Sequence, residues 1–182
     1  MDLISMHHCS LSEYSDLQTK ENIGKVLRMK NSPEIDAHDT RILAELQADA
    51  RITVAELGRR VHLSQPAVAE RLRKLEANGV ITGYRATINL AALGFGIRAI
   101  VRAGRSDYNR MANLVSQLPE IVNAWNITGE DSWLFEIAVV DVAHLDAVVS
   151  QICLLAETST SIILKSVREH QVMLPRSTEA TT

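Results

Sequence analysis

The sequence predicts an α+β protein with two domains, an N-terminal winged helix-turn-helix and a C-terminal ferredoxin-like sheet of βαββαβ order. Two patterns predict this fold class. From Asp36 to Gly79, apolar residues recur at helical spacing in three short segments that each follow a capping residue. From Ile97 to Val167, four strand-like segments are interleaved with two helical ones. Gly94 and Gly96 mark the change from one pattern to the other.

The first two helices are predicted from their caps. Asp36 is a good N-cap for the first helix, with Asp39 in its first turn. Thr53 opens a second, shorter helix, and Glu56 three residues later completes the Thr-x-x-Glu pattern of a capping box. His62-Leu63 then forms a tight turn. The apolar stripes of the two helices are Ile35, Ile42, Leu43 and Leu46, then Leu57 and Val61.

The third helix is predicted to follow Ser64, which is another N-cap. Pro66 is tolerated in the first turn because the N–H that it lacks would have no partner there. Gly79 is placed to end the helix in the left-handed conformation. The stripe at i, i+4 and i+7 that should face the interior is Val68, Leu72 and Leu75.

The opposite face of the third helix is suited to a DNA duplex. A recognition helix presents small or amide side chains to base edges near its N-terminus and cations to phosphates further along. From Arg59 to Lys74, five cations stand against one anion, a local net charge of +4 that favours phosphates. The residues predicted to contact DNA are Ser64, Gln65, Pro66, Ala69, Arg71, Arg73, Lys74, Arg59 and Arg60.

Within this set, the sequence favours particular roles. Gln65 is the candidate for a base contact because its amide can bond adenine through two hydrogen bonds. Arg73 and Lys74 are predicted phosphate contacts. Ser64 caps the helix and can also meet a phosphate.

The other cations have alternative roles. Arg71 lies nearer the buried side and would either contact DNA or pair with Glu56 or Glu76. Arg59 and Arg60 end the second helix, where the helix dipole favours cations whether or not DNA binds.

A wing and a linker are expected after the third helix. Val80 and Ile81, followed by Gly83 and Tyr84, favour a small β-ribbon beside the helices. Tyr84 is expected to pack on this wing, with a contact to the DNA backbone as the alternative. Residues 85–93 are expected to form a linker strand and hinge.

The second domain is predicted from alternation and helical spacing. Pro119 ends its first helix, Thr128 to Asp131 forms a turn, and Asp141 caps its second helix. These elements form an antiparallel sheet with both helices on one face. In order, they are a strand over Ile97–Ala103, a helix over Asp107–Leu118, strands over Ile121–Ile127 and Trp133–Val140, a helix after Asp141 and a strand over Ser161–Val167.

The other face of this sheet should not be left exposed to water. Trp125 and Trp133 flank the turn, and the strands are strongly apolar. A partner subunit is the natural cover, so we expect a homodimer through the sheet and larger rings. A dimer would also let two recognition helices read two half-sites.

Composition limits the classes of function. The chain has 182 residues, 46% hydrophobic and 23% charged, with a formal net charge of −3, so it is an ordinary globular protein and not a general polyanion binder. No signal peptide or membrane-spanning run is visible, and few cysteines fit a reducing compartment, so we expect a cytoplasmic, nucleoid-associated protein of a bacterium or archaeon. Cys153 lies in an apolar run and is expected to be a buried thiol.

Metal, cofactor and catalytic sites are not predicted. His7, His8 and Cys9 are metal-ligand types, but three adjacent residues cannot all face one ion from a regular element. No nucleophile motif or glycine-rich phosphate loop is present, so we expect no enzyme and no cofactor.

We expect five segments along the chain. Residues 1–34 are polar without a clean period and favour a flexible N-terminal extension, in which Met29 is an alternative translation start. The others are 35–84 for the DNA-binding domain, 85–93 for the linker, 94–175 for the second domain and 176–182 for a tail.

From Ile35 to Pro175, the chain resembles the Lrp/AsnC (feast/famine) transcription regulators. The second half is similar to the effector domain of that family, the RAM domain, with Thr128 to Leu134 at its glycine turn. Both halves in this order make the resemblance specific. The carriers in the first half are Asp36, Asp39, Ile42-Leu43, Leu57, Leu63-Ser64, Glu70-Arg71, Leu75-Glu76, Gly79-Val80-Ile81 and Gly83-Tyr84.

The resemblance implies a dimer, often assembled to an octamer, that binds promoter DNA. It also implies an amino acid or related metabolite bound between effector domains near the glycine turn. Many family members have a second acid where this chain has Ser132. The effector candidates carried over are Gly129, Glu130, Asp131 and Ser132, with Thr128 at the start of the same turn. Thr158, Thr160 and Ser161 are weaker candidates, because hydroxyls at the start of a strand are common in any protein.

The glycine turn has a simpler interpretation as well. Glu130 and Asp131 could be solvent-facing turn acids, although backbone N–H groups at Gly129 can bind a carboxylate.

The sequence therefore predicts a sequence-specific DNA-binding transcriptional regulator that responds to an amino acid or related metabolite. One alternative is an architectural, chromatin-like DNA-binding protein without an effector. Another is a metabolite-binding oligomer with a vestigial helix-turn-helix.

Overall fold

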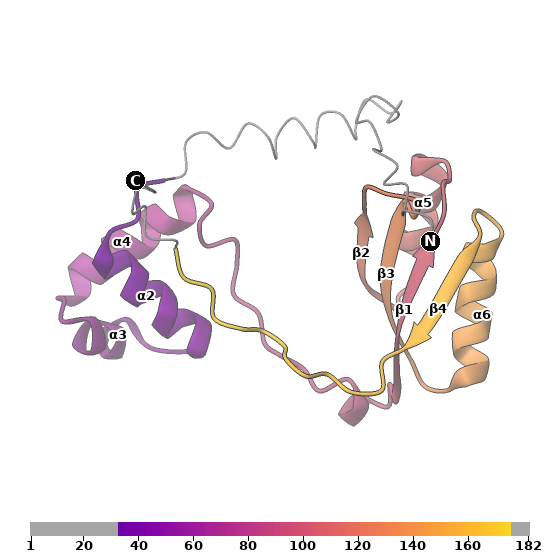
Figure 1. Cartoon of the computed structure of the whole chain (residues 1–182). Coiled ribbons are helices and arrows are strands. Elements are labelled where there is room, and N and C mark those ends of the chain that lie inside the picture. The colour runs from indigo at the N-terminus through magenta and orange to yellow at the C-terminus, as the bar shows by residue number, and fades with distance from the viewer. Residues whose placement is uncertain (1–32, 176–182) are drawn as a thin grey trace, which may run out of the picture. The chain divides into compact units, whose positions relative to one another are not determined.

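The computed structural model describes residues 33–175, which form two compact units (Figure 1). The sheet unit comprises residues 88–166, and the DNA-binding unit comprises residues up to Thr87 together with those from Val167 onward. The sheet unit thus ends before Pro175, where the sequence predicts the end of the second domain. The predicted N-terminal extension, its metal-ligand types His7, His8 and Cys9, and the predicted tail lie almost wholly outside the described residues.

Three helices form the DNA-binding unit: α2 (Ala37–Ala48), α3 (Val54–Val61) and α4 (Gln65–Ala77). Asp36 and Asp39 form a complete capping box at the start of α2. Thr53 accepts a hydrogen bond from the backbone of Glu56, but the Glu56 carboxylate pairs with arginines of α3 instead of closing the predicted box. Ser64 caps α4 as predicted.

The core of this unit is small and confirms the predicted stripes. Its buried members are Ile42, Leu57, Val61, Val68 and Leu75. Leu72 is half-buried and packs against this core. Because the apolar faces of α3 and α4 meet here, their opposite faces are turned toward solvent.

The predicted wing is absent. Among the described residues, none between Asn78 and Gly96 belongs to a strand. Instead, the backbone N–H groups of Val80 and Ile81 both donate to the Leu75 carbonyl, at 2.9 and 3.1 Å, and the two side chains pack on the helical core. The apolar character of Val80 and Ile81 is therefore explained by their burial against α4 and not by pairing in a strand. The linker over residues 85–93 holds only a short 3₁₀ turn, Ala91–Leu93, in place of the predicted strand.

The sheet unit has the predicted βαββαβ order. Its elements are β1 (Ile97–Ala103), α5 (Tyr108–Gln117), β2 (Ile121–Asn126), β3 (Trp133–Val139), α6 (Val142–Cys153) and β4 (Thr158–Ile162). The sheet is antiparallel in the order β2-β3-β1-β4, with Val101 opposite both Phe135 and Thr160. Inward residues of β1 and β3 pack with α5 and α6 in one core, so both helices cover one face (Figure 1).

Three predictions for this unit need correction. β4 begins at Thr158 and ends at Ile162, because pairing with β1 sets its extent and the local sequence does not. Trp133 is buried on the helix side, with its ring 5.4 Å from Tyr108 and 5.9 Å from Phe135, so it does not lie on the open face. Cys153 is exposed at the end of α6, where its sulfur lies 3.0 Å from the Thr158 hydroxyl.

Residues 33–175 contain neither a membrane-spanning helix nor a cluster of metal ligands. None of these helices has the length and apolar character needed to cross a bilayer. No three potential metal ligands converge among them.

Candidate DNA-binding and effector sites

The outer face of α4 is open to solvent. Gln65, at the start of the helix, is exposed, as are Pro66 and Ala69, whereas Val68 and Leu75 are buried. The Ser64 hydroxyl accepts a hydrogen bond from the Ala67 backbone at 3.4 Å and is also exposed. Capping thus places the amide of Gln65 at the exposed N-terminus of the helix, as base reading in a major groove requires.

The two cations further along α4 are held by one acid. Glu70 accepts two hydrogen bonds from Arg73, at 2.8 and 3.0 Å, and its carboxylate lies 3.6 Å from the Lys74 ammonium. The Arg73 hydrogen bonds hold the pKa of Glu70 below its usual range. Because all three side chains are exposed, these pairs contribute little to folding, and the cations are available to phosphates.

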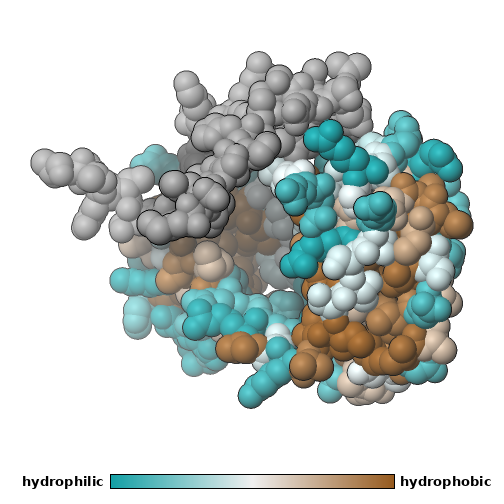
Figure 2. Space-filling model, turned by 45° about the vertical axis from the view of Figure 1, so that its right-hand side comes forward, coloured by the Kyte–Doolittle hydropathy of each residue, from teal (hydrophilic) through white to brown (hydrophobic). Residues whose placement is uncertain are grey.

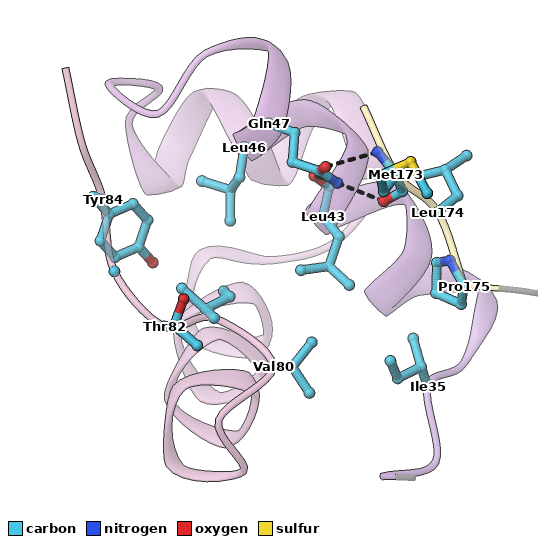
Figure 3. Close-up of a pocket in the computed structure, with 12 residues that line it drawn as sticks. Ile35, Leu43, Leu46, Gln47, Val80, Thr82, Tyr84, Met173, Leu174 and Pro175 are labelled. Atoms are coloured by element: carbon cyan, nitrogen blue, oxygen red, sulfur yellow. Dashed lines mark hydrogen bonds between the residues drawn. The ribbon is translucent and has the colours of Figure 1, made fainter. Parts of the chain in front are cut away.

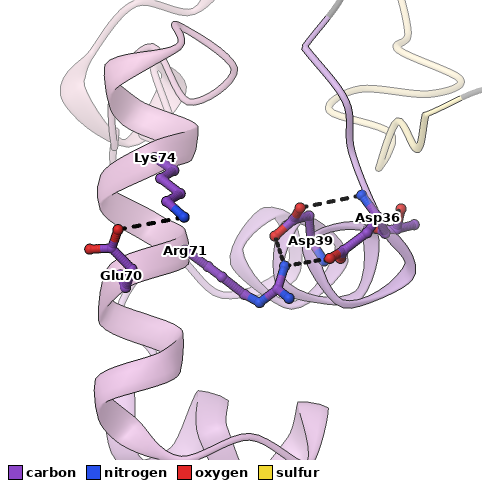
Figure 4. A network of polar contacts seen from close by, with 6 residues as sticks. Asp36, Asp39, Glu70, Arg71 and Lys74 are labelled. Atoms are coloured by element: carbon purple, nitrogen blue, oxygen red, sulfur yellow. Dashed lines mark hydrogen bonds and ion pairs between the residues drawn. The ribbon is translucent and has the colours of Figure 1, made fainter.

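Arg71 faces α2 and is not on this outer face (Figure 4). Its guanidinium lies 2.7 Å from carboxylate oxygens of both Asp36 and Asp39, and its side chain is half-buried. Among the described contacts, Arg71 pairs with these two acids and not with Glu56 or Glu76, the partners that the sequence suggested. The structure therefore assigns Arg71 to holding α4 against the start of α2.

The same contacts make this junction sensitive to acid. The backbone N–H of Asp39, followed by Arg71, holds the pKa of Asp36 below its ordinary value of 3.8. A lowered pKa in the folded protein means that the contribution to stability is complete above that ordinary value. It is lost as the pH falls through the lowered value.

Replacing Arg71 with methionine is expected to lower the free energy of unfolding of the DNA-binding unit by about 1–2 kcal/mol. The substitution keeps an apolar stem but leaves Asp36 and Asp39 without their cation. Chemical denaturation followed by circular dichroism measures the change. An unchanged midpoint would show that the ion pairs do not hold α4.

The arginines of α3 have local partners too. Arg59 pairs with Glu56 in the same helix and remains strongly exposed. Arg60 bonds Glu56 at 2.8 Å and Glu45 of α2 at 2.7 Å, so it links two helices. Arg59 is therefore the better placed of the two for a phosphate.

Tyr84 has a partner within the DNA-binding unit. Its hydroxyl donates to the carboxylate of Glu76 at 2.8 Å. Burial and this acid raise the pKa of Tyr84 to about 12, so the phenol stays neutral at neutral pH. Tyr84 is therefore joined to α4 by this hydrogen bond, and residues 33–175 form no wing on which it could pack.

The glycine turn joins β2 to β3 at one end of the sheet. The Ile127 N–H donates to the Ser132 carbonyl at 2.8 Å, and the Ser132 N–H donates to the Ala103 carbonyl at 2.9 Å. Between them, Gly129 has φ +126°, a conformation that side chains with a Cβ rarely adopt. Thr128 and Glu130 are exposed, while Asp131 and Ser132 are half-buried.

The structure adds Arg102 to this site. Its Nε lies 3.9 Å from a carboxylate oxygen of Asp131, so a cation stands beside the turn. The alternation of β1 predicts that Arg102 points away from the helices, but only strand register shows that it meets the turn.

Thr160 is not part of the turn within one chain. It lies opposite Val101 on β4, and β1 separates it from β3. Two strand spacings put it about 10 Å across the sheet. Because it shares a face with the buried Val101, it is also on the helix side. Serines 159 and 161 take the opposite face.

Comparison with known proteins identifies both units. The AsnC-type helix-turn-helix domain model matches residues 35–76, and the Lrp/AsnC ligand binding domain model matches residues 97–173. A leucine-responsive regulatory protein of Rhizobium meliloti is 37% identical over 142 residues, which cover 75% of this chain and 91% of that protein. The chain belongs to the Lrp/AsnC family of transcriptional regulators. The predicted family is thereby confirmed, as is the predicted α+β class with a helix-turn-helix before an antiparallel sheet, the wing excepted.

Solved structures of Lrp/AsnC proteins agree with this placement. LrpC of Bacillus subtilis superposes with a TM-score of 0.72 at 30% identity, covering 75% of this chain and 99% of that one. The feast or famine regulatory protein of Mycobacterium tuberculosis, complexed with L-methionine, gives 0.72 at 30% identity, covering 78% and 100%. This Lrp/AsnC member is therefore a transcriptional regulator whose helix-turn-helix precedes a ligand-binding domain.

Proposed function

We propose that this Lrp/AsnC regulator reads a specific duplex through the outer face of α4. The observation that carries the proposal is the exposed amide of Gln65 at the helix N-terminus, followed by exposed cations. Gln65 contacts a base, Arg73 and Lys74 contact phosphates, and Ser64, Pro66 and Ala69 fit against the groove. Arg59 adds a phosphate contact from α3, with Arg60 beside it.

The proposed effector is an amino acid or a related metabolite at the glycine turn. Backbone N–H groups around Gly129 and the guanidinium of Arg102 suit a carboxylate. Glu130, Asp131 and Ser132 would then face the ammonium group and side chain, with Thr128 at the rim. The complex of the M. tuberculosis relative with L-methionine supports this chemical class.

The proposed assembly is a homodimer through the open face of the sheet, able to build larger rings such as an octamer. Trp125 on β2 lies on this face, opposite Leu134, and is 44% exposed. Apolar side chains are exposed elsewhere on the molecule as well (brown in Figure 2). In the middle of this face, Glu136 lies 2.5 Å from Arg98 and accepts a hydrogen bond from Asn123 at 2.8 Å. Thr160 of one subunit would join an effector site only if the assembly brings it there.

Gel shifts test the regulator against the two alternatives. We expect the protein to prefer a duplex selected from a random pool over its scrambled version, and an amino acid to change that binding. Equal affinity for both duplexes without any amino-acid effect would favour the architectural alternative. No binding at low salt would favour the vestigial helix-turn-helix.

The regulator is expected in the cytoplasm with the nucleoid.

Replacing Arg73 with alanine is expected to weaken binding to all duplexes. The slope of log affinity against log salt should decrease by about one unit because one phosphate contact is lost. Fluorescence anisotropy at several salt concentrations measures this slope. Arg71→Met serves as the control that should leave the slope unchanged, and an equal slope for Arg73→Ala would remove Arg73 from the phosphate contacts.

Replacing Gln65 with alanine is expected to change sequence preference at one base pair by about 1–3 kcal/mol. The side chain is exposed, so folding should be unaffected. Competition among duplexes that differ at single positions measures the preference. If the variant ranks these duplexes as the parent does, Gln65 does not read a base.

A further inference from the structure

The segment Gln171–Pro175, near the C-terminus, lies against α2 in the DNA-binding unit (Figure 3). The side-chain amide of Gln47 holds the backbone of Met173 at both polar groups. Its Nε2 donates to the Met173 carbonyl, and its Oε1 accepts from the Met173 N–H, each at 2.8 Å. Only a primary amide side chain can pair with a backbone in this two-point way.

Beneath the segment is an apolar cavity of about 480 Å³. Leu43 and Leu46 of α2 line one part of it, and Val80 and Ile81 line another. Met173 and Leu174 line one side of it but are 73% and 51% exposed, so their side chains do not fill it (Figure 3). With little apolar area buried, the attachment depends largely on the Gln47 amide.

An attachment of this kind is expected to open and close. Segments with few buried apolar contacts and exposed hydrogen bonds open at low free-energy cost. The Gln47 side chain is exposed, so water competes for the same hydrogen bonds.

Because of its position in the chain, the attached segment forms a second connection between the DNA-binding unit and the sheet unit. The sheet unit, residues 88–166, is flanked on both sides by parts of the DNA-binding unit. The linker over residues 85–93 connects the units at one end and contains no strand. The chain leaves the sheet unit again after Ser166, and the segment held by Gln47 attaches it to the DNA-binding unit a second time.

We propose that Gln171–Pro175 is a detachable second tether, which restricts the motion of the DNA-binding unit relative to the sheet unit when Gln47 holds Met173. This inference rests on the proposed DNA-binding function and deepens it. In a dimer, two closed connections in each subunit allow the recognition helices a narrower range of separations than one connection does. Release of the segment widens that range.

Hydrogen exchange of the full chain tests the attachment. The Met173 amide should exchange about five- to tenfold faster in Gln47→Leu than in the parent, since that variant loses both hydrogen bonds. Gln151→Leu is the matched control, because both glutamines are exposed on a helix and donate to the carbonyl four residues earlier, Gln47 to Leu43 at 3.1 Å and Gln151 to Ala147 at 3.4 Å. It should leave the Met173 amide unchanged. Equal exchange in all three proteins would refute the attachment.

Selection of duplexes from a random pool tests the consequence. The parent and Gln151→Leu should recover half-sites with one narrow spacing, whereas Gln47→Leu should recover the same half-sites over a wider range of spacings. Accelerated exchange with an unchanged spacing distribution would overturn the tether. Failure of the parent to enrich any duplex would refute the DNA-binding function itself, while hydrogen exchange would still decide the attachment.

Discussion

Replacing Gly58 with valine is expected to abolish DNA binding while leaving the sheet unit folded. Gly58 is buried in α3, where the turn into α4 crosses it at close range. A Cβ at this position would lie 2.7 Å from the Leu63 carbonyl oxygen. The backbone has little room to move away, because the Leu63 N–H donates to the Gly58 carbonyl at 2.9 Å. Overpacking of this kind costs about 1–3 kcal/mol, a large share of the stability available to so small a core.

The expected result is a lower melting temperature for the helical unit and no retarded complex in a gel shift. Ala55→Val is the matched control, because it puts the same β-branched side chain on an exposed position of α3. This control should bind DNA nearly as well as the parent. Normal binding by Gly58→Val would show that the close approach of α3 to the turn is dispensable.

The second large effect is expected at the effector site, where Gly129→Val should abolish the response to an amino acid. At φ +126°, a β-branched residue is strongly disfavoured, so the turn must change its backbone path. The N–H groups offered to a carboxylate would then point elsewhere. A strain of about 1–2 kcal/mol corresponds to a loss of affinity of about five- to thirtyfold.

Thermal shift with each of the twenty amino acids measures the response, because a ligand that binds only the folded protein raises its melting temperature. Gly94→Val is the matched control, since Gly94 also has a positive φ, +93°, with no atom near its missing Cβ, but lies outside the turn. The control should keep the response and Gly129→Val should lose it. Retention by Gly129→Val would place the effector elsewhere.

Features encoded by neighbouring residues were predictable from the sequence. The capping residues Asp36, Ser64, Asp107 and Asp141 all cap the helices that they were expected to begin. Helix caps and the alternation of β1 depend on residues within a few positions, so one sequence contains the whole signal.

Features set by distant residues were not predictable in the same way. Arg71 has acidic partners more than thirty positions away, and β4 takes its extent from β1. Trp133 faces inward because the pairing of β3 with β1 fixes which face each residue takes. The apolar pair Val80 and Ile81 resembled a ribbon because burial on a helix and pairing in a strand both select apolar residues.

In the candidate sites too, features set by neighbouring residues were predictable and features set by distant residues were not. The exposed face of α4 followed from helical spacing, which placed Pro66, Ala69 and Arg73 away from the buried Val68, while Gln65 is exposed as the first residue of the helix. The proximity of Arg102 to the turn and the separation of Thr160 from it required the order of the strands. Gly58 carried a local signal, since an isolated glycine within a helix often marks a close contact.

The central claim is that the outer face of α4 lies against DNA. Its most direct test is a photo-crosslinking amino acid at position 65 in the full-length protein, irradiated with labelled duplex from the selection. The claim predicts a crosslink that excess unlabelled duplex of the same sequence removes and scrambled duplex does not. A protein that retards the duplex in a gel yet forms no crosslink from position 65, while the same amino acid at the exposed position 105 on the sheet unit does, would contradict it.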